Sequence, residues 1–444
     1  MLAALALMAP CSRATAQDWF VDASAPPGGD GKSWPTAFDH LQDALALATS
    51  GEEIWVAQGV YAPTFLSEPP DPRSATFLLP GAVRIYGGFQ GGETTLERRA
   101  GLFDQTVLSG DLGVAGDPAD NAYHVVRMLG APQAGPTVLD GFTIRDGSGL
   151  VPGGAQRKGG GVHLTGNGPY GPVLELGNCR VRDNRAESGG GIAALDLASL
   201  FMRDCIVLDN RAQLHGGGLF ALTPWAVRAY NTTWVGNSAQ GDGGAVFLNS
   251  TAPDSIWFVN GLFHSNRAER GAAAMLKGGP FTSGGGKWFQ CTVAFNQAVS
   301  EGGGFHADPS SVIPPKLHIF NSILWGNTLG SGASEQIFGA GNVQRTLVEG
   351  GWPGAGNLAG DPLFVDPAGG DLRTAQGSPA HDSASNLLVP FDLFDFDGDG
   401  LAGEPVPRDL DGNLRFGFDP SAAGFGVGWP GQDGVVVDMG AYEF

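Results

Sequence analysis

Carboxylates at alternate positions mark the acidic C-terminal segment of this 444-residue chain. Asp395, Asp397 and Asp399 are followed by a glycine, an arrangement that suits a sharp calcium-binding loop because Ca²⁺ takes several oxygen ligands. Glu404 and Asp409 follow closely and add two more carboxylates. The spacing predicts a structural Ca²⁺ site formed by these five side chains. The alternative is a solvated acidic turn.

A second set of titratable residues occurs twice in the same local sequence, Asp-Asn-Arg, at residues 183–185 and 209–211. If the two copies stack, Asp183 and Asp209 lie about one strand spacing apart, ~4.8 Å. That separation is near the one between the two carboxyl groups of a retaining glycosidase. Beside them, Arg185 and Arg211 are candidates to bind an acidic sugar. Ordinary turn Asp–Arg pairs are the alternative, because a repeat places like residues together without any catalysis.

Other side chains are candidates for weaker roles. His215 and Lys158 lie beside runs of glycines. Trp225, Trp257 and Trp288 fall between the repeated motifs, where an indole ring would meet the face of a sugar. Exposed aromatic rings often mark binding surfaces, and ordinary packing is the alternative for each of them.

All these residues depend on an internal repeat for their positions. Its signature is a small residue, an apolar residue two positions later, an asparagine three positions after that, and then an alanine and a glycine-rich turn. The asparagines are separated by 26, 27, 29, 30 and 31 residues, and they are Asn184, Asn210, Asn237, Asn266, Asn296 and Asn327. Units of short strands and glycine turns cannot bury an apolar face alone, so each must stack on its neighbours. The repeat therefore predicts an all-β fold, a right-handed parallel β-helix.

Equivalent positions of the repeat are expected to form columns along this β-helix. The six asparagines predict an internal ladder, because stacked amides one strand spacing apart hydrogen-bond along the column. Cys179, Cys205 and Cys291 occupy the small inward position. We expect them to be buried free thiols, which behave as small apolar groups. The alanines that follow the asparagines are expected where a turn presses against the core.

The chain divides into four expected parts. Residues 1–16 contain a short apolar run and a small-x-small motif, which is typical of a secretory signal peptide. Residues 17–50 form an N-terminal cap, in which an amphipathic helix at 36–48 covers the open end of the β-helix at 51–360. Residues 361–444 form an acidic C-terminal module, which we expect to dock on the last coil and cover its open edge.

The composition restricts the classes of function. The chain has 25 Lys and Arg against 45 Asp and Glu, a net charge of −20, which argues against nucleic acid as a partner. Beyond the N-terminal region no segment reaches the ~20 apolar residues that a membrane helix requires. We therefore expect a monomer, secreted or at the cell surface, with a polysaccharide or cell-surface glycan as its partner.

Four segments carry a resemblance to known proteins. Residues 51–63 (GEEIWVAQGVYAP) and 77–94 (FLLPGAVRIYGGFQGGET) resemble the first coils of secreted bacterial parallel β-helix proteins of the pectin-lyase-like and polymorphic outer-membrane-protein type. Residues 361–384 (DPLFVDPAGGDLRTAQGSPAHDSA) and 437–444 (VDMGAYEF) resemble a choice-of-anchor Q domain. The resemblance implies an exported β-helix protein and no particular reaction.

Two functions fit these observations. The first is an exported, non-catalytic surface or adhesion protein that binds a glycan or another protein along its flank. The alternative is a polysaccharide lyase or glycoside hydrolase that acts in a groove on the same β-helix. A lyase needs a base close to a neutralising cation or metal. The charged residues of the repeats are scattered, apart from those at 183–185 and 209–211, so the sequence favours non-catalytic binding.

Overall fold

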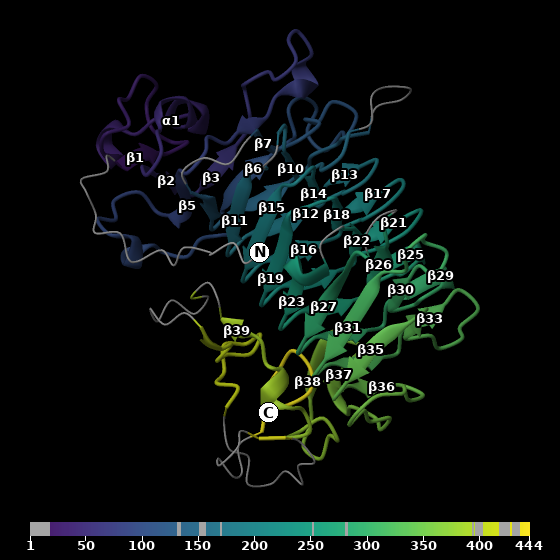
Figure 1. Ribbon diagram of the computed structural model, residues 1–444. Helices are drawn as coiled ribbons and strands as arrows, with labels where there is room; N and C mark the ends of the chain where they lie inside the picture. The colour runs from purple at the N-terminus through teal and green to yellow at the C-terminus, as the bar shows by residue number, and fades with distance from the viewer. Residues whose placement is uncertain are drawn as a thin grey trace.

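The computed structural model describes residues 18–130, 135–150, 157–168, 171–250, 253–279, 283–392, 395, 403–416, 427–428 and 436–444. Parallel strands wind through these residues in successive coils, and the coils stack into an elongated body (Figure 1). The predicted all-β parallel β-helix is confirmed. Among the described residues, no helix is both long enough and apolar enough to span a membrane.

Two long parallel sheets cover adjoining faces of this body. Within the described residues, sheet 1 has eleven strands: β1 (Asp18–Val21), β2 (Glu53–Ala57), β5 (Arg84–Phe89), β8 (Thr137–Asp140), β11 (Val173–Gly177), β15 (Ser199–Arg203), β19 (Ala226–Tyr230), β23 (Ile256–Val259), β27 (Gly285–Phe289), β31 (Lys316–Phe320) and β35 (Gly341–Gln344). Sheet 2 has ten: β3 (Gly59–Tyr61), β6 (Thr106–Ser109), β9 (Thr143–Arg145), β12 (Arg180–Arg182), β16 (Ile206–Leu208), β20 (Thr233–Val235), β24 (Leu262–His264), β28 (Thr292–Ala294), β32 (Ile323–Trp325) and β36 (Leu347–Val348).

Two further parallel sheets complete the coil. Six short strands of the described chain form sheet 3: β13 (Arg185–Ala186), β17 (Arg211–Ala212), β21 (Ser238–Ala239), β25 (Arg267–Arg270), β29 (Gln297–Glu301) and β33 (Thr328–Leu329). Nine described strands form sheet 4: β4 (Phe77–Leu78), β7 (Val126–Leu129), β10 (Val162–Thr165), β14 (Ile192–Leu195), β18 (Leu219–Leu222), β22 (Val246–Asn249), β26 (Ala274–Lys277), β30 (Phe305–Ala307) and β34 (Ile337–Phe338). A repeated coil therefore passes through sheets 1, 2, 3 and 4 in that order.

The corners between these sheets explain why the repeat is rich in Asn, Asp and Gly. Each repeated coil turns with left-handed backbone two residues before its strand in sheet 2, two residues before its strand in sheet 3 and three residues before its strand in sheet 4. In one coil these are Asp204 (φ 53°), Asp209 (φ 54°) and Gly216 (φ 65°). Gly tolerates this conformation without a steric cost, and Asn and Asp tolerate it better than most residues. The pattern in the sequence thus marks the corners.

The apolar core occupies the centre of the coils along the whole β-helix. Its inward columns are continuous from strand to strand. In sheet 1, for example, Phe258 pairs with Trp288, and their rings stack at 5.0 Å between centroids. Cys179, Cys205 and Cys291 are 0, 1 and 0 % exposed, as the repeat predicts. Burial raises the pKa of Cys179 and of Cys291 to about 12 and that of Cys205 well above its ordinary value, so these thiols stay protonated.

The N-terminal cap contains a shorter helix than the sequence predicts. The helix α1 spans Leu41–Leu47 and contacts β1, β2 and β4. The expected helical start at residue 36 is wrong, because Phe38 instead continues sheet 1 and forms a parallel bridge with Val21 of β1. The predicted apolar face is nevertheless buried, with Phe38, Leu45 and Ala48 each 8 % exposed.

The described part of the C-terminal module docks on the flank of the β-helix, and it reaches the last coil at Leu347. Its strands include β37 (Phe364–Asp366), β38 (Asp371–Thr374), β39 (Phe391–Asp392) and β40 (Glu404–Pro405), which lie beside the later coils in Figure 1. Its apolar side chains cluster with residues of sheets 1 and 2 as early as Tyr230 and as late as Leu347. Among the described residues, the segment after β36 also covers the last coil, where Leu358 bridges Leu347 and Trp352 packs on the main core.

Candidate functional site

The repeated asparagines form a buried, hydrogen-bonded column between sheets 2 and 3. All six are 0 % exposed. The amide nitrogen of each of the first five donates to the side-chain oxygen of the asparagine one coil further on, at 2.8 to 3.1 Å, and that of Asn327 donates to Gln336 Oε1 at 2.6 Å. The backbone N–H of every asparagine but the last donates to the same oxygen. The column therefore connects the coils and presents no polar group to a ligand.

The two predicted aspartates lie in consecutive coils at the corner before sheet 3. Asp183 and Asp209 both adopt left-handed backbone, with φ of 57° and 54°. Burial raises the pKa of Asp209, and the neighbouring Asp183 raises it further. Asp183 accepts a hydrogen bond from Arg182 at 2.7 Å. These contacts describe a turn whose carboxylates repel one another in part and pair locally.

The predicted arginines lie on sheet 3 itself, where the register pairs Arg185 with Arg211. The same column continues through Ser238 to Arg267 and Gln297 in the following coils. Arg211 and Arg267 are exposed. Two residues after each of the first five ladder asparagines stands a buried alanine, and after Asn327 the half-buried Leu329 takes this place. The side of the body formed by sheet 3 therefore presents alternating long polar and small apolar side chains.

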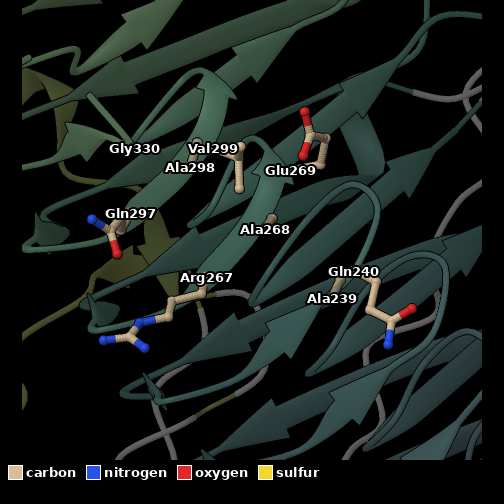
Figure 2. Close-up of a pocket in the computed structure, with 9 residues that line it drawn as sticks. All are labelled: Ala239, Gln240, Arg267, Ala268, Glu269, Gln297, Ala298, Val299 and Gly330. Carbon is tan, nitrogen blue, oxygen red and sulfur yellow. The ribbon is translucent and has the colours of Figure 1, made fainter. Parts of the chain in front are cut away.

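A groove runs along this side of the body, and Figure 2 shows the nine residues that line it. Its volume is about 520 Å³, and its lining comprises Ala239, Gln240, Arg267, Ala268, Glu269, Gln297, Ala298, Val299 and Gly330. The alanines form the floor, at 8, 4 and 0 % exposed for residues 239, 268 and 298. Arg267 and Gln297 stand on one side of them, whereas Gln240, Glu269 and Val299 stand on the other (Figure 2). The alanines pack inward as expected, with Ala268 and Ala298 in a small buried apolar cluster with Ala272, and they also line the groove.

The chemistry of the groove is that of hydrogen bonding. Arg267 offers guanidinium N–H donors, Glu269 offers carboxylate acceptors, and the glutamine amides offer both. The floor alanines leave room because their side chains are a single methyl group. A ligand with many hydroxyl groups and flat apolar faces suits such a lining.

His215 and Lys158 lie at a neighbouring position, just before the glycine corner that leads into sheet 4. Asp242 occupies the same position one coil beyond His215, and its backbone N–H donates to His215 Nδ1 at 3.2 Å. Asp242 itself accepts two hydrogen bonds from Arg270, at 2.8 and 2.9 Å. The His215 ring stacks on Phe247 at 4.7 Å between centroids. The structure therefore places this histidine in a charged row along the edge of sheet 4, outside the groove.

The three tryptophans have three different environments. Trp288 is 0 % exposed in the core, so its prediction as a sugar contact is wrong. On the outer face of sheet 1, the Arg228 guanidinium lies over the Trp257 ring, 4.7 Å from the ring centroid, and the Lys287 ammonium lies 5.8 Å from it. Trp225 is 59 % exposed in the connection between β18 and β19. Of the three, Trp225 retains a ring that is open to solvent.

The predicted calcium ligands are only partly described. Asp397 and Asp399 lie outside the described residues. Asp409 is 0 % exposed, and its carboxylate accepts hydrogen bonds from Asn413, from the backbone of Asp411 and from the backbone of Glu443. Glu404 lies on β40. Calcium binding thus remains a prediction, to be tested by melting curves with calcium and with excess chelator.

The groove walls were not among the predicted site residues. One wall nevertheless follows a column of the repeat, because the residue after the alanine is Glu or Gln in four of five coils: Glu187, Gln213, Gln240, Glu269 and Val299. This column was the available signal, and it marks a line of long side chains next to a line of small ones. The register between coils then decides which side chains flank the line.

Three solved structures show how this architecture compares with known proteins. The pectate lyase Pel9A aligns at a TM-score of 0.47 and 11 % identity, over 97 % of both chains. The complex of XylC with xylose aligns at 0.36 and 10 %, over 94 % of this chain and 99 % of that one. A pectin methylesterase from Aspergillus niger aligns at 0.27 and 13 %, over 78 and 85 %. No protein-family model matches the sequence, and no curated protein matches it.

Proposed function

We propose that this chain is an exported, non-catalytic β-helix protein that binds a glycan in the groove on sheet 3. The observation that supports the proposal is the lining of the groove, a floor of alanine methyl groups between polar walls. The apolar faces of sugar rings fit such a floor, and Arg267, Gln240 and Gln297 supply groups that hydrogen-bond to hydroxyls. The signal-peptide motif at residues 1–16 supports export.

The lining also favours binding over catalysis. Glycoside hydrolysis commonly uses two carboxyl groups on opposite sides of the scissile bond. Among the residues that line the groove, Glu269 is the one acid. Asp183 and Asp209 lie at a corner and are not among the lining residues. The alternative function is a lyase, for which Arg267 and Glu269 would be the neutralising cation and the base.

A glycan array probed with the mature chain tests the proposal, followed by calorimetry with the glycans it selects. The double variant Arg267→Ala, Gln297→Ala is expected to weaken binding at least about tenfold, because it removes hydrogen bonds from one wall. Lys316→Ala, which changes an exposed lysine on sheet 1, is the control and is expected to bind as the wild type does.

Product assays separate the two candidate functions. Selected glycans are incubated with the wild-type chain, and both new reducing ends and unsaturated products are measured. We expect neither to form. Product formation that Glu269→Gln abolishes would establish the lyase or hydrolase instead. Binding that is unchanged in the double variant would remove the groove as the site.

A further inference from the structure

Basic side chains gather at the N-terminal end of sheet 4, on its outer face. Arg127 on β7 and His163 on β10 occupy paired positions of adjacent strands. Arg157 and Lys158 come shortly before β10. Glu68, from the excursion between β3 and β4, pairs with Arg157 through two hydrogen bonds of 2.6 and 2.8 Å. In a chain with a net charge of −20, this leaves a local excess of positive charge.

These cations retain donors that the described protein groups do not occupy. The Nε atom of Arg127 is buried and has no hydrogen-bond partner among the described residues. The ammonium of Lys158 lies 5.6 Å from the centre of the Phe220 ring, a contact that leaves its N–H groups available. His163 Nδ1 lies 2.7 Å from the carbonyl oxygen of Lys158 and so donates to it. Its Nε2 is the nitrogen that can accept a further proton.

The positive charge acts on a stacked pair of histidines. The rings of His124 and His163 lie 4.6 Å apart between centroids. Burial and the three neighbouring cations together lower the pKa of His163 to about 4, although its hydrogen bond to the Lys158 carbonyl opposes them. Burial also lowers the pKa of His124, with His163 as the next cause. Both rings are therefore neutral near pH 7, and the site holds positive charge that an anion would offset.

Three carboxylates lie near this cluster, those of Asp71, Glu68 and Glu187, and the first two are already engaged. The backbone N–H of Glu187 donates to the Arg157 carbonyl at 3.2 Å, and its buried Oε2 has no hydrogen-bond partner among the described residues. Asp71 accepts hydrogen bonds from the hydroxyl of Tyr123 at 2.8 Å and from the backbone of Arg73 at 3.0 Å. The Tyr123 ring lies 4.5 Å from the Arg73 guanidinium and 4.6 Å from that of Arg157. Asp71 and Glu68 thus hold Arg73 and Arg157 in place. Arg127 and Lys158 are left without such a carboxylate partner among the hydrogen bonds of the described residues.

We propose that Arg127, Lys158 and His163 form a binding site for an oxyanion, the carboxylate or sulfate group of an acidic saccharide. A guanidinium binds such a group through parallel hydrogen bonds, and an ammonium adds a compact charge. The saccharide rests on the proposed function, whereas the anion site itself stands on this cluster. An anion beside His163 favours the charged imidazole, so binding takes up a proton and becomes tighter as the pH falls.

Calorimetric titration of the mature full-length chain with inorganic sulfate tests the anion site, at constant ionic strength in a chloride background. We expect saturable binding that is tighter at about pH 5 than at about pH 7.5, with net proton uptake. Arg127→Gln and Lys158→Gln are each expected to weaken binding about tenfold. Lys158 is partly exposed, so its variant tests the site even if the Arg127 variant does not fold.

Two further variants complete the test. His163→Gln is expected to bind sulfate without the pH dependence, and Lys316→Gln, on sheet 1, is expected to bind as the wild type does. The proposal is wrong if the Arg127 and Lys158 variants bind sulfate as tightly as the wild type, or if the wild type shows no saturable binding.

Polymer titrations then distinguish the source of the anion. An oligogalacturonate carries carboxylates, dextran sulfate carries sulfates, and plain dextran carries neither. If only one anionic polymer binds Lys158→Gln more weakly than the wild type, the charged group of that polymer is the ligand. An equal loss of affinity for both polymers means that the site accepts either oxyanion. If neither polymer binds while sulfate does, the saccharide assignment is wrong and the anion site stands. The groove variant Arg267→Ala, Gln297→Ala is expected to leave the sulfate titration unchanged, which separates failure of this site from failure of the groove.

Discussion

Two columns of polar side chains run along the same coils and form hydrogen bonds with different kinds of partner. In the inner ladder, from Asn184 to Asn327, each amide bonds to the next coil. At the corner between sheets 1 and 2, Asn260 donates to the carbonyl of Arg408, and Asn321 exchanges two hydrogen bonds with the backbone of Ser385. The amides of the inner column form hydrogen bonds with equivalent amides of the next coil, whereas those of the corner column form them in part with the C-terminal module.

The difference lies in which side of the coil each column faces. An inward amide is surrounded by copies of itself, so the repeat alone supplies donors and acceptors. An outward corner amide has one side open, and a segment that does not repeat can bind there. The module therefore attaches across several coils through corner amides and an apolar cluster, and the flank formed by sheet 3 stays open.

The largest loss of stability is expected from a change at Arg415, which joins the module to the corner column. This side chain is 0 % exposed, and it bonds to Asn260 at 3.1 Å and to Glu443 at 3.0 Å. Arg415→Ala leaves a buried carboxylate unpaired, so we expect a loss of about 3–5 kcal/mol and release of the module. Chemical unfolding and limited proteolysis measure both effects. Arg373→Ala, which breaks an exposed pair with Asp411, is the control and should cost at most about 1 kcal/mol.

The module should also respond to pH, unlike the ladder, which contains no titratable group. Asp438 is 4 % exposed, and burial raises its pKa to about 7 in the folded protein. The folded state thus holds a proton that the unfolded chain releases near pH 4. The stabilisation that comes from protonated Asp438 is fully present below about pH 4 and is lost as the pH rises through about 7. Each unit by which the folded and unfolded pKa values differ corresponds to about 1.4 kcal/mol in the free energy of unfolding.

Thermal unfolding between about pH 4 and 8 measures this slope. Asp438→Asn is expected to reduce it, because the amide does not titrate. The remaining slope comes from Glu443, whose pKa burial also raises well above its ordinary value. Wild-type stability that is constant over this range would show that the docked module does not hold Asp438 protonated.

Within the ladder, Asn237→Ala is expected to destabilise the β-helix itself. It removes the acceptor for both nitrogens of Asn210 and the donor to the Val207 carbonyl. An unsatisfied buried group costs about 1–3 kcal/mol. Asn231→Ala, at a partly exposed corner position, is the matched control and should cost less. Equal unfolding midpoints for the two variants would contradict the distinction between the columns.

The smallest expected change in the free energy of unfolding is an increase. Gln290 lies between Asn260 and Asn321 in the corner column, is 0 % exposed, and has no hydrogen-bond partner for either amide atom among the described residues. Gln290→Met keeps the approximate volume and removes the unsatisfied amide, so we expect stabilisation of about 1 kcal/mol. Destabilisation measured by chemical unfolding would show that the amide is satisfied in solution.

The fold and its inner column could be predicted because they arise from local repetition. The small residues at 179 and 205, the apolar residues two positions later and the recurring asparagine each occupy an equivalent place in every coil. Stacking then leaves one architecture that buries the apolar positions. The start of the first helix was predicted at residue 36 and lies at Leu41, because pairing of Phe38 with Val21 overrides the helical pattern.

The candidate sites could be predicted only in part. Arg185 and Arg211 do share one column, but the groove lies at later coils, where the same column continues as Arg267 and Gln297. Trp257 and Trp288 are near each other in sequence pattern, but one faces outward and the other inward, because side chains alternate across a strand and the connections differ in length. Neither outcome can be read from a single unit of the repeat.

The sequence by itself determined the coil: its length, its corners of Asn, Asp and Gly, its inward columns and its ladder. These depend on contacts between equivalent residues, which the repeat makes explicit. Only the tertiary structure decided where the module docks, which flank stays open as a groove, and how Arg127, Lys158 and His163 come together. Those arrangements depend on which side chains of different coils face one another, and the register and connection lengths of the whole stack determine that.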